Sequence, residues 1–459
     1  MSAVEIAAKI GSGSLSAREA VESHLARIEA ENPKYNAVVT LAAEQALEAA
    51  DTADRQLAAG EPVGPLHGVP VVHKDLQPTR GIRTTYGSRL FHDFVPDADS
   101  LLVERIKAAG AITLGKTNTP EFGAGSQTFN AVFGKTLNPW DTAKTCGGST
   151  GGGAVALATG MAPLADGSDL GGSLRNPASF CSVVGLRPTA GRIPAWPTQF
   201  PWMPLSVEGP MARSVSDLAL FCSAIAGYDA RAPLSFDDGA DFAAPLGRSF
   251  RGTRVAWWTG LGGIPVDKRV RDITDAQRGV FEALGCIVED AEPDLSGADE
   301  VFRTLRTWMT GVRLGEAVRA HPALFKDTLH WEVEKASQLT AQQVGNAHVR
   351  LAEIHERMRK FMDRHEFFVL PVSQVPPFDV NLPYPMEVDG VRMETYIDWM
   401  KSCYLISVTG APALSVPAGF TPEGLPVGIQ IVAGHRKERA LLEMGFAFEQ
   451  AVNITRRLI

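Results

Sequence analysis

The sequence has few cysteines and few sustained hydrophobic runs. Five cysteines stand among 459 residues, which is an odd number, and no two of them have the CxxC spacing. A long chain of this kind is typical neither of a disulfide scaffold nor of a zinc site. The longest stretch of small apolar residues, 151–165, contains four glycines and falls short of a membrane span. We therefore expect no disulfide framework, no zinc and no membrane partner.

An excess of positive charge is also absent. The formal net charge is −8 and the isoelectric point is about 5.8, whereas a nucleic-acid-binding surface is basic. The ten histidines form no HExxH motif and no tight cluster, so no metal is expected. Acidic Glu5 and the lack of a long apolar core near the N-terminus argue against a secretory signal. The sequence therefore predicts a cytoplasmic protein without a nucleic-acid partner, in which the sequon at 453–455 carries no glycan.

What the chain does have is the composition of an ordinary globular protein, with 45% hydrophobic and 21% charged residues. Helix-like and strand-like hydrophobic patterns alternate along it, which is typical of an α/β fold. The predicted helices cover 16–28, 36–59, 100–109, 214–227, 268–284 and most of 300–364. The predicted strands cover 69–72, 111–114, 254–258, 286–288, 367–371, 413–416 and 428–432.

These elements predict one large α/β domain over 1–459. Its core would be a central, mixed, twisted β-sheet covered by helices on both faces. The predicted parts are N-terminal helices at 1–60, a core with the candidate site at 61–228, an exposed connection at 229–250, and a second α/β part at 251–459 that completes the sheet and the pocket.

Two serines in glycine-rich turns and one lysine form the candidate site. Ser149 lies in 147–152 and Ser173 in 171–178. A serine that attacks a carbonyl needs a base and backbone N–H groups aimed at the developing oxyanion. Lys74 follows the apolar run 69–72 after one intervening residue, and a lysine drawn into a core loses its charge and becomes a base. A surface position is the ordinary alternative for a lysine.

Two other motifs point to different chemistry. Residues 110–117 match the P-loop pattern GxxxxGK[ST], but the four intervening residues are themselves the predicted strand and no helix start follows, so nucleotide binding is rejected. Residues 147–151 match the GxSxG elbow of α/β hydrolases. Because His435 follows the last predicted strand, a Ser–His esterase that uses Ser149 and His435 remains an alternative.

Three motifs taken together resemble the amidase signature family. They are the lysine motif at 68–75, the first serine motif at 147–152, and the second serine motif at 169–178, which runs on into 185–192. The resemblance covers nearly the whole chain and is most specific over 68–213. The sequence departs from the family pattern at Thr150, where a second serine is common, at Cys146, often a proline, and at His73, usually a small apolar residue.

The resemblance implies a Ser–cis-Ser–Lys triad. Ser173 would be the acylated nucleophile, Ser149 would relay the proton after a cis peptide bond, and neutral Lys74 would be the general base. The backbone N–H groups of Leu170, Gly171, Gly172 and Ser173 would form the oxyanion hole.

The resemblance also implies roles for neighbouring residues. Residues 123–127, among them Gly125 and Gln127, would line the acyl side of the pocket, and Thr150 would keep a hydroxyl beside the triad. Asp169 and Arg175 would brace the second serine loop, with binding of an acidic substrate group as the alternative for Arg175.

The implied activity is hydrolysis of a small amide to acid plus amine or ammonia, without metal or other cofactor. Trp196, Phe200 and Trp202 lie in a proline-rich segment, which favours an apolar or aryl substrate. Further aromatic or sulfur side chains, read mainly as core, are Trp308, Trp331, Tyr384, Met386, Tyr396 and Trp399. A glutamine-hydrolysing subunit of a tRNA-dependent amidotransferase and a non-catalytic binding protein are the alternatives, and a homodimer is a family-level expectation.

Overall fold

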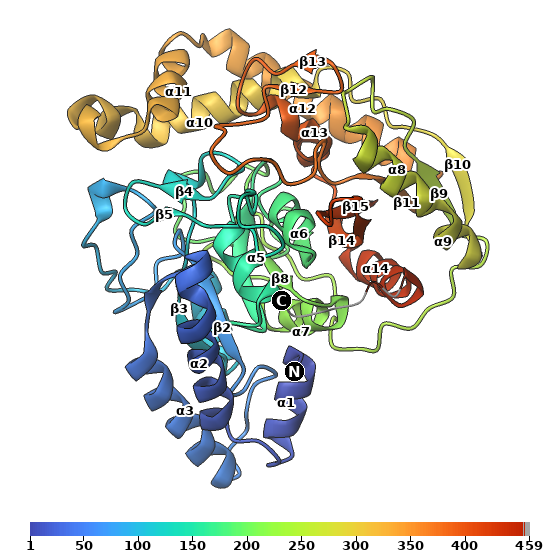
Figure 1. Cartoon of the computed structure of the whole chain (residues 1–459). Coiled ribbons are helices and arrows are strands. Elements are labelled where there is room, and N and C mark those ends of the chain that lie inside the picture. The colour runs from blue at the N-terminus through green and yellow to red at the C-terminus, as the bar shows by residue number, and fades with distance from the viewer. Residues whose placement is uncertain (453, 455–459) are drawn as a thin grey trace.

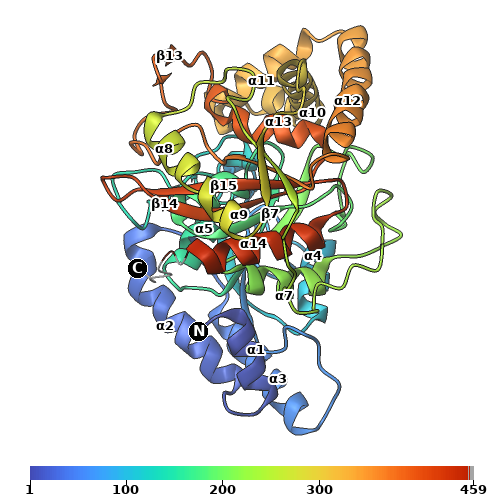
Figure 2. The ribbon, with the colours of Figure 1, turned by 90° about the vertical axis from the view of Figure 1, so that its right-hand side faces the viewer.

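The computed structural model describes residues 1–452 and 454, so Asn453 and Thr455 of the sequon lie outside it. An eleven-stranded sheet runs through the molecule, with α1–α3 beyond one side of it and α10–α12 beyond the other (Figures 1 and 2). The predicted single α/β domain with a central mixed sheet is confirmed. In the described part of the chain, no helix combines the length and the apolar character that crossing a bilayer needs.

The strand order is β1-β3-β2-β6-β8-β7-β14-β15-β11-β9-β10. Strand β2 is parallel to β3 and β6, and β9 is parallel to β10 and β11, while the other neighbours are antiparallel. The strands are β1 Val38–Leu41, β2 Pro70–Lys74, β3 Ile112–Thr117, β6 Leu164–Asp169, β7 Val184–Arg187, β8 Val207–Ala212, β9 Arg254–Trp257, β10 Ile287–Asp290, β11 Phe367–Pro371, β14 Ala413–Phe420 and β15 Pro426–Ala433. Two small hairpins pair β4 Phe129–Asn130 with β5 Gly134–Lys135, and β12 Glu387–Val388 with β13 Val391–Arg392.

Several of the helices begin at a serine that caps their first turn. Ser16 and Ser214 each accept a hydrogen bond from the backbone N–H three residues on, and Ser16 completes a capping box with Glu19. The helices are α1 Ala3–Gly11, α2 Ala17–Tyr35, α3 Ala43–Ala58, α4 Leu101–Ala108, α5 Gly151–Ala158, α6 Arg175–Cys181, α7 Val215–Ile225, α8 Lys268–Ala276, α9 Arg278–Ala283, α10 Ala298–Ala320, α11 Asp327–Ser337, α12 Ala341–Met362, α13 Lys401–Thr409 and α14 Glu438–Val452.

Helices cover opposite faces of the sheet at β14 and β15. Ser179 of α6 packs on Gly428, whereas Gly445 of α14 packs on Leu414. The register pairs Leu414 with Ile431 and leaves Gly428 on the alternate set of positions, so the two contacts lie on opposite faces. This is the layering that the alternating sequence pattern predicts.

The predicted helix at 36–59 is wrong in its first third. Asn36 ends α2 in the left-handed conformation, with φ of 54°, which asparagine tolerates better than most residues. Val38–Leu41 then forms β1, whose β-branched residues pair antiparallel with β3, and only Ala43–Ala58 is helical. The predicted helix at 268–284 is interrupted at Gln277, which separates α8 from α9.

The connection at 229–250 contains no helix or strand, but it is anchored to the body of the protein. Phe242 and Phe250 of the connection are buried. Asp238 of the connection forms an ion pair with Arg192, which also pairs with Glu438 of α14. All five cysteines are free and buried.

Candidate active site

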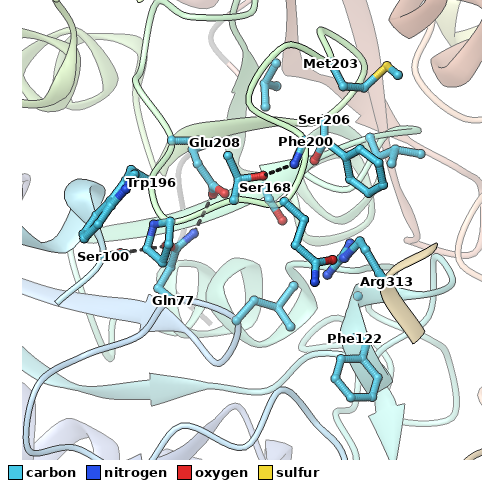
Figure 3. Close-up of a pocket in the computed structure, with 18 of the residues that line it drawn as sticks. Gln77, Ser100, Phe122, Ser168, Trp196, Phe200, Met203, Ser206, Glu208 and Arg313 are labelled. Carbon is cyan, nitrogen blue, oxygen red and sulfur yellow. Dashed lines mark hydrogen bonds between the residues drawn. The ribbon is translucent and has the colours of Figure 1, made fainter. Parts of the chain in front are cut away.

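A cavity of about 720 Å³ is lined by three of the candidate residues, Ser149, Leu170 and Ser173. Its polar side is formed by the ends of β6 and β8 and by the loops that carry Ser149 and Ser173. Its other walls come from the segments around 76–102 and 190–206 and from α10 (Figure 3). Ser149, Ser168 and Ser173 all face this one space.

Lys74 ends β2 and is completely buried. Its Nζ lies 2.7 Å from Ser149 Oγ, 2.9 Å from Thr150 Oγ1 and 3.1 Å from Ser168 Oγ. Burial lowers the pKa of Lys74 from 10.5 to about 7, although Glu208 and other nearby carboxylates oppose the shift. The site therefore holds a lysine that can be neutral near neutral pH, surrounded by hydroxyl groups.

The Ser149 loop is held by the chain that passes behind it. The Gly148–Ser149 peptide bond is cis. Ser126 Oγ donates to the Gly148 carbonyl at 2.8 Å, and Thr128 Oγ1 donates to the Gly147 carbonyl at 2.8 Å. Gly147 adopts a φ of 75°, a conformation that favours glycine. These contacts fix the turn that presents Ser149 to Lys74.

The Ser173 loop connects β6 to α6 around a buried carboxylate. Asp169 accepts hydrogen bonds from Gly172 N–H at 2.9 Å, from Leu174 N–H at 3.2 Å and from the guanidinium of Arg175. Burial alone would raise the pKa of Asp169, but Arg175 and Arg187 hold it well below its usual range. Arg175 is fully buried and also donates hydrogen bonds to the side chains of Gln430 and Ser407 and to the carbonyl of Cys403.

Ser173 itself is partly accessible from the cavity, and its hydroxyl has no hydrogen-bond partner among residues 1–452. The same part of the chain offers no acceptor to the N–H groups of Leu170, Gly171 and Ser173. The expectation for Gly172 is wrong, because its N–H is already donated to Asp169. Three free N–H groups thus remain beside the Ser173 hydroxyl.

Gly125, Gln127 and Thr150 do not line the cavity, contrary to expectation. The Gln127 amide turns away and donates to the carbonyls of Leu382 and Pro383 at 2.9 and 2.6 Å. The backbone of Gln127 packs behind Gly148, so this segment supports the serine loop from the rear. The Thr150 hydroxyl is buried against Lys74.

The aromatic residues of the proline-rich segment have different positions. Trp196 and Phe200 line the cavity, whereas Trp202 is 73% exposed and does not. Trp399 is core, packed on Phe180. Trp308 packs behind Phe200.

The Ser–His alternative is contradicted by the surroundings of His435. Its ring contacts that of His355 at 5.3 Å between centroids, and it does not line the cavity. Burial lowers the pKa of His435 to about 4. Ser149 instead meets Lys74, and its turn follows a loop rather than the strand that a nucleophile elbow needs.

Several site residues have no clear signal in the sequence. Ser168 and Glu208 face each other across β6 and β8, and Gln77 and Arg313 complete the polar side. The same cavity is lined by an aromatic cluster composed of Tyr86, Phe91, Phe94 and Phe122. Glu208 lies inside the stretch 68–213 in which the resemblance to the family is most specific, and this is the one pointer to it in the sequence.

The model of the amidase family matches residues 19–442. The chain is 35% identical over 464 residues to an acylamidase of Rhodococcus erythropolis, covering 98% of this chain and 95% of that protein. It is 35% identical over 477 residues to one subunit of the glutamyl-tRNA(Gln) amidotransferase of Halorhodospira halophila, covering 98% of this chain and 96% of that protein.

A solved structure, a bacterial aryl acylamidase of the amidase signature family, superposes with a TM-score of 0.93 at 30% identity, covering 98% of this chain and 96% of that one. The chain therefore belongs to the amidase signature family, and it is an amide-hydrolysing enzyme.

Proposed function

We propose that this chain hydrolyses small apolar or aryl amides through an acyl-enzyme on Ser173, with Ser149 as proton relay and Lys74 as general base. One observation carries the proposal. Lys74 Nζ lies 2.7 Å from Ser149 Oγ, in a turn that opens into the cavity that Ser173 also faces. A lysine whose pKa lies near 7 can accept a proton near neutral pH.

The proposed proton path combines the Lys74–Ser149 contact with the relay between the two serines that the family resemblance implies. Neutral Lys74 accepts the proton of the Ser149 hydroxyl, and Ser149 in turn accepts the proton of the Ser173 hydroxyl. The Ser173 oxygen then forms a bond to the carbonyl carbon of the substrate. The N–H groups of Leu170, Gly171 and Ser173 then bind the oxyanion. As the C–N bond breaks, the leaving amine receives a proton from Ser149, and Lys74 returns its proton to Ser149. Water repeats the sequence on the acyl-enzyme and releases the acid.

Asp169 and Arg175 are proposed to hold the Ser173 loop rather than to bind substrate. Arg175 is fully buried, and its guanidinium is occupied by Asp169 and by groups of α13 and β15. An acidic substrate group could reach it only by displacing these partners, which would leave a buried carboxylate unpaired.

The substrate class is proposed from the cavity wall. The aromatic cluster of Tyr86, Phe91, Phe94 and Phe122 supplies apolar surface and ring edges suited to an aryl group. Trp196 and Phe200 also line the cavity. The names of two similar proteins, an acylamidase and an aryl acylamidase, agree with this class.

The second candidate is a glutamine-hydrolysing component of a tRNA-dependent amidotransferase, because several similar proteins carry such a name. Its small polar substrate is a poor match for an aromatic wall. The cytoplasmic location and a homodimer are further proposals, which fractionation and sedimentation would test.

The deciding experiment is a substrate panel: an aryl anilide, a fatty amide, a short aliphatic amide and glutamine. Wild type is compared with Ser173→Ala, Lys74→Ala and His435→Ala. We expect loss of activity in the first two variants, an active His435 variant and the highest kcat/KM for the anilide. Preferential glutaminase activity would favour the amidotransferase candidate, and a folded, active Lys74→Ala enzyme would overturn the mechanism.

The pH dependence gives an independent test. Because Lys74 must be neutral, kcat/KM for the anilide should rise with pH through about 7 and then level off. A flat profile from pH 5 to 9 would contradict Lys74 as the base.

A further inference from the structure

A carboxylate that the triad does not include lies on the strand next to the lysine. Glu208 of β8 pairs directly with Ser168 of β6 in the antiparallel ladder, so their side chains share one face of the sheet. Ser168 Oγ lies 3.1 Å from Lys74 Nζ. Ser168 thus separates the amine of Lys74 from the carboxyl group of Glu208, and both serine and glutamate face the cavity (Figure 3).

Glu208 is held in this position by a chain of hydrogen bonds. Gln77 Nε2 donates to Glu208 Oε2 at 2.5 Å, while Gln77 Oε1 accepts from Ser100 Oγ at 2.9 Å (Figure 3). Buried Lys116 donates to the backbone carbonyl of Gln77. The second carboxyl oxygen of Glu208 has no hydrogen-bond partner in the described part of the chain. The carboxyl group is therefore oriented on one side and open to the cavity on the other.

The charges around this pair act on both members. Burial lowers the pKa of Lys74 to about 7 and raises that of Glu208 to about 7, and each ionised group opposes the shift of the other. Asp169 and Asp166 also favour the charged lysine. Asp166 raises the pKa of Glu208 while Arg313 lowers it. His73 pairs with Asp166. Lys116 contacts the backbone carbonyl of Gln77, the residue whose side chain binds Glu208.

We propose that Glu208 is a positioning residue for the proton of Lys74 and sets the lower pH limit of catalysis. The proposal rests on Lys74 being the base. When Glu208 is ionised, it stabilises the ammonium form of Lys74, which cannot accept a proton from Ser149. When Glu208 holds the proton instead, Lys74 carries an amine. One proton is thus shared between the two groups, and the carboxyl group decides how much neutral lysine exists at a given pH.

The test compares pH profiles of kcat/KM for an anilide in wild type and Glu208→Gln. Glutamine keeps the size of the side chain and removes its charge. Because an opposite charge raises the pKa of an ammonium group, the midpoint of the acid limb should move to lower pH by about one unit or more. The control is Glu300→Gln, which makes the same charge change at an exposed carboxylate outside the cavity and should leave the midpoint unchanged.

The outcomes separate the candidate roles. A midpoint that stays fixed or moves upward overturns the proposal, and so does a higher KM with an unchanged midpoint, which would make Glu208 a substrate contact. A shift of equal size in Glu300→Gln also overturns it. If Glu208→Gln does not fold, Glu208→Ala is profiled under the same criterion.

Lys74→Ala, assayed in parallel, separates this proposal from the assignment of the base. An inactive Lys74→Ala together with an unshifted Glu208→Gln profile removes only the role of Glu208. An active Lys74→Ala enzyme removes the base assignment and, with it, this proposal.

Discussion

Lys74 should lower the stability of the folded protein at neutral pH. Burial lowers its pKa from 10.5 to about 7 in the native state, so between these pH values the unfolded chain binds a proton that the native state lacks. Stability therefore rises with pH across this window. Since one pKa unit corresponds to roughly 1.4 kcal/mol, the contribution of Lys74 changes by roughly 3–4 kcal/mol between pH 7 and pH 10.

The perturbation is Lys74→Met, which removes the titrating group and keeps most of the volume. The free energy of unfolding of the variant relative to wild type should fall by roughly 3–4 kcal/mol between pH 7 and pH 10. The lost hydrogen bonds to Ser149, Thr150 and Ser168 do not depend on pH in this window, so they cancel in the comparison. Without Lys74 the pKa of Glu208 rises further, and this change acts in the same direction.

Urea unfolding followed by tryptophan fluorescence at pH 7, 8, 9 and 10 measures the effect. Lys268→Met removes an exposed lysine and shows what the loss of any one ammonium group does. Parallel curves of unfolding free energy against pH for wild type and Lys74→Met would refute the inference that Lys74 is neutral in the native state.

The remaining predictions concern the serine loop and the cavity wall. Ser173→Ala should abolish hydrolysis and labelling by a serine-reactive probe while the melting temperature stays close to that of wild type, because its hydroxyl has no hydrogen bond in the described chain; residual labelling would argue for another nucleophile. Arg175→Met should cost about 3–5 kcal/mol in urea unfolding, because it leaves Asp169 buried without its main partner; a loss under 1 kcal/mol would contradict the bracing role. Phe200→Ala should raise KM for an anilide roughly tenfold, and Trp202→Ala should leave KM unchanged because that ring points to solvent; equal effects would contradict the described wall.

The sequence predicts those features whose cause is local. Ser16 and Ser214 begin helices because each hydrogen-bonds within its own turn. The turns around Ser149 and Ser173 are visible because glycine is needed at particular backbone angles, as at Gly147. Lys74 follows a short apolar run, which predicts a buried strand, and the structure places this run in β2.

Features that depend on strand pairing could not be predicted. Glu208 lies on the far side of Ser168 from the lysine because β8 lies beside β6 in a register that pairs Glu208 with Ser168. Gln127 turns away from the cavity because the carbonyls of Leu382 and Pro383, far along the chain, accept its amide hydrogens. Such contacts are long-range, and no local propensity encodes them.

The proposed catalytic groups lie in one stretch of the chain, and part of the cavity wall comes from other stretches. Lys74 to Ser173 is a single run of sequence, which also carries the aromatic cluster. The rest of the aromatic and apolar wall is supplied by 190–206 and by α10. Substitutions in those later stretches can reshape the binding space without moving Lys74 from Ser149. Chimeras that exchange 190–206 or α10 with a related amidase should therefore transfer substrate preference while turnover chemistry stays with the recipient, which makes these two stretches natural units for both divergence and engineering.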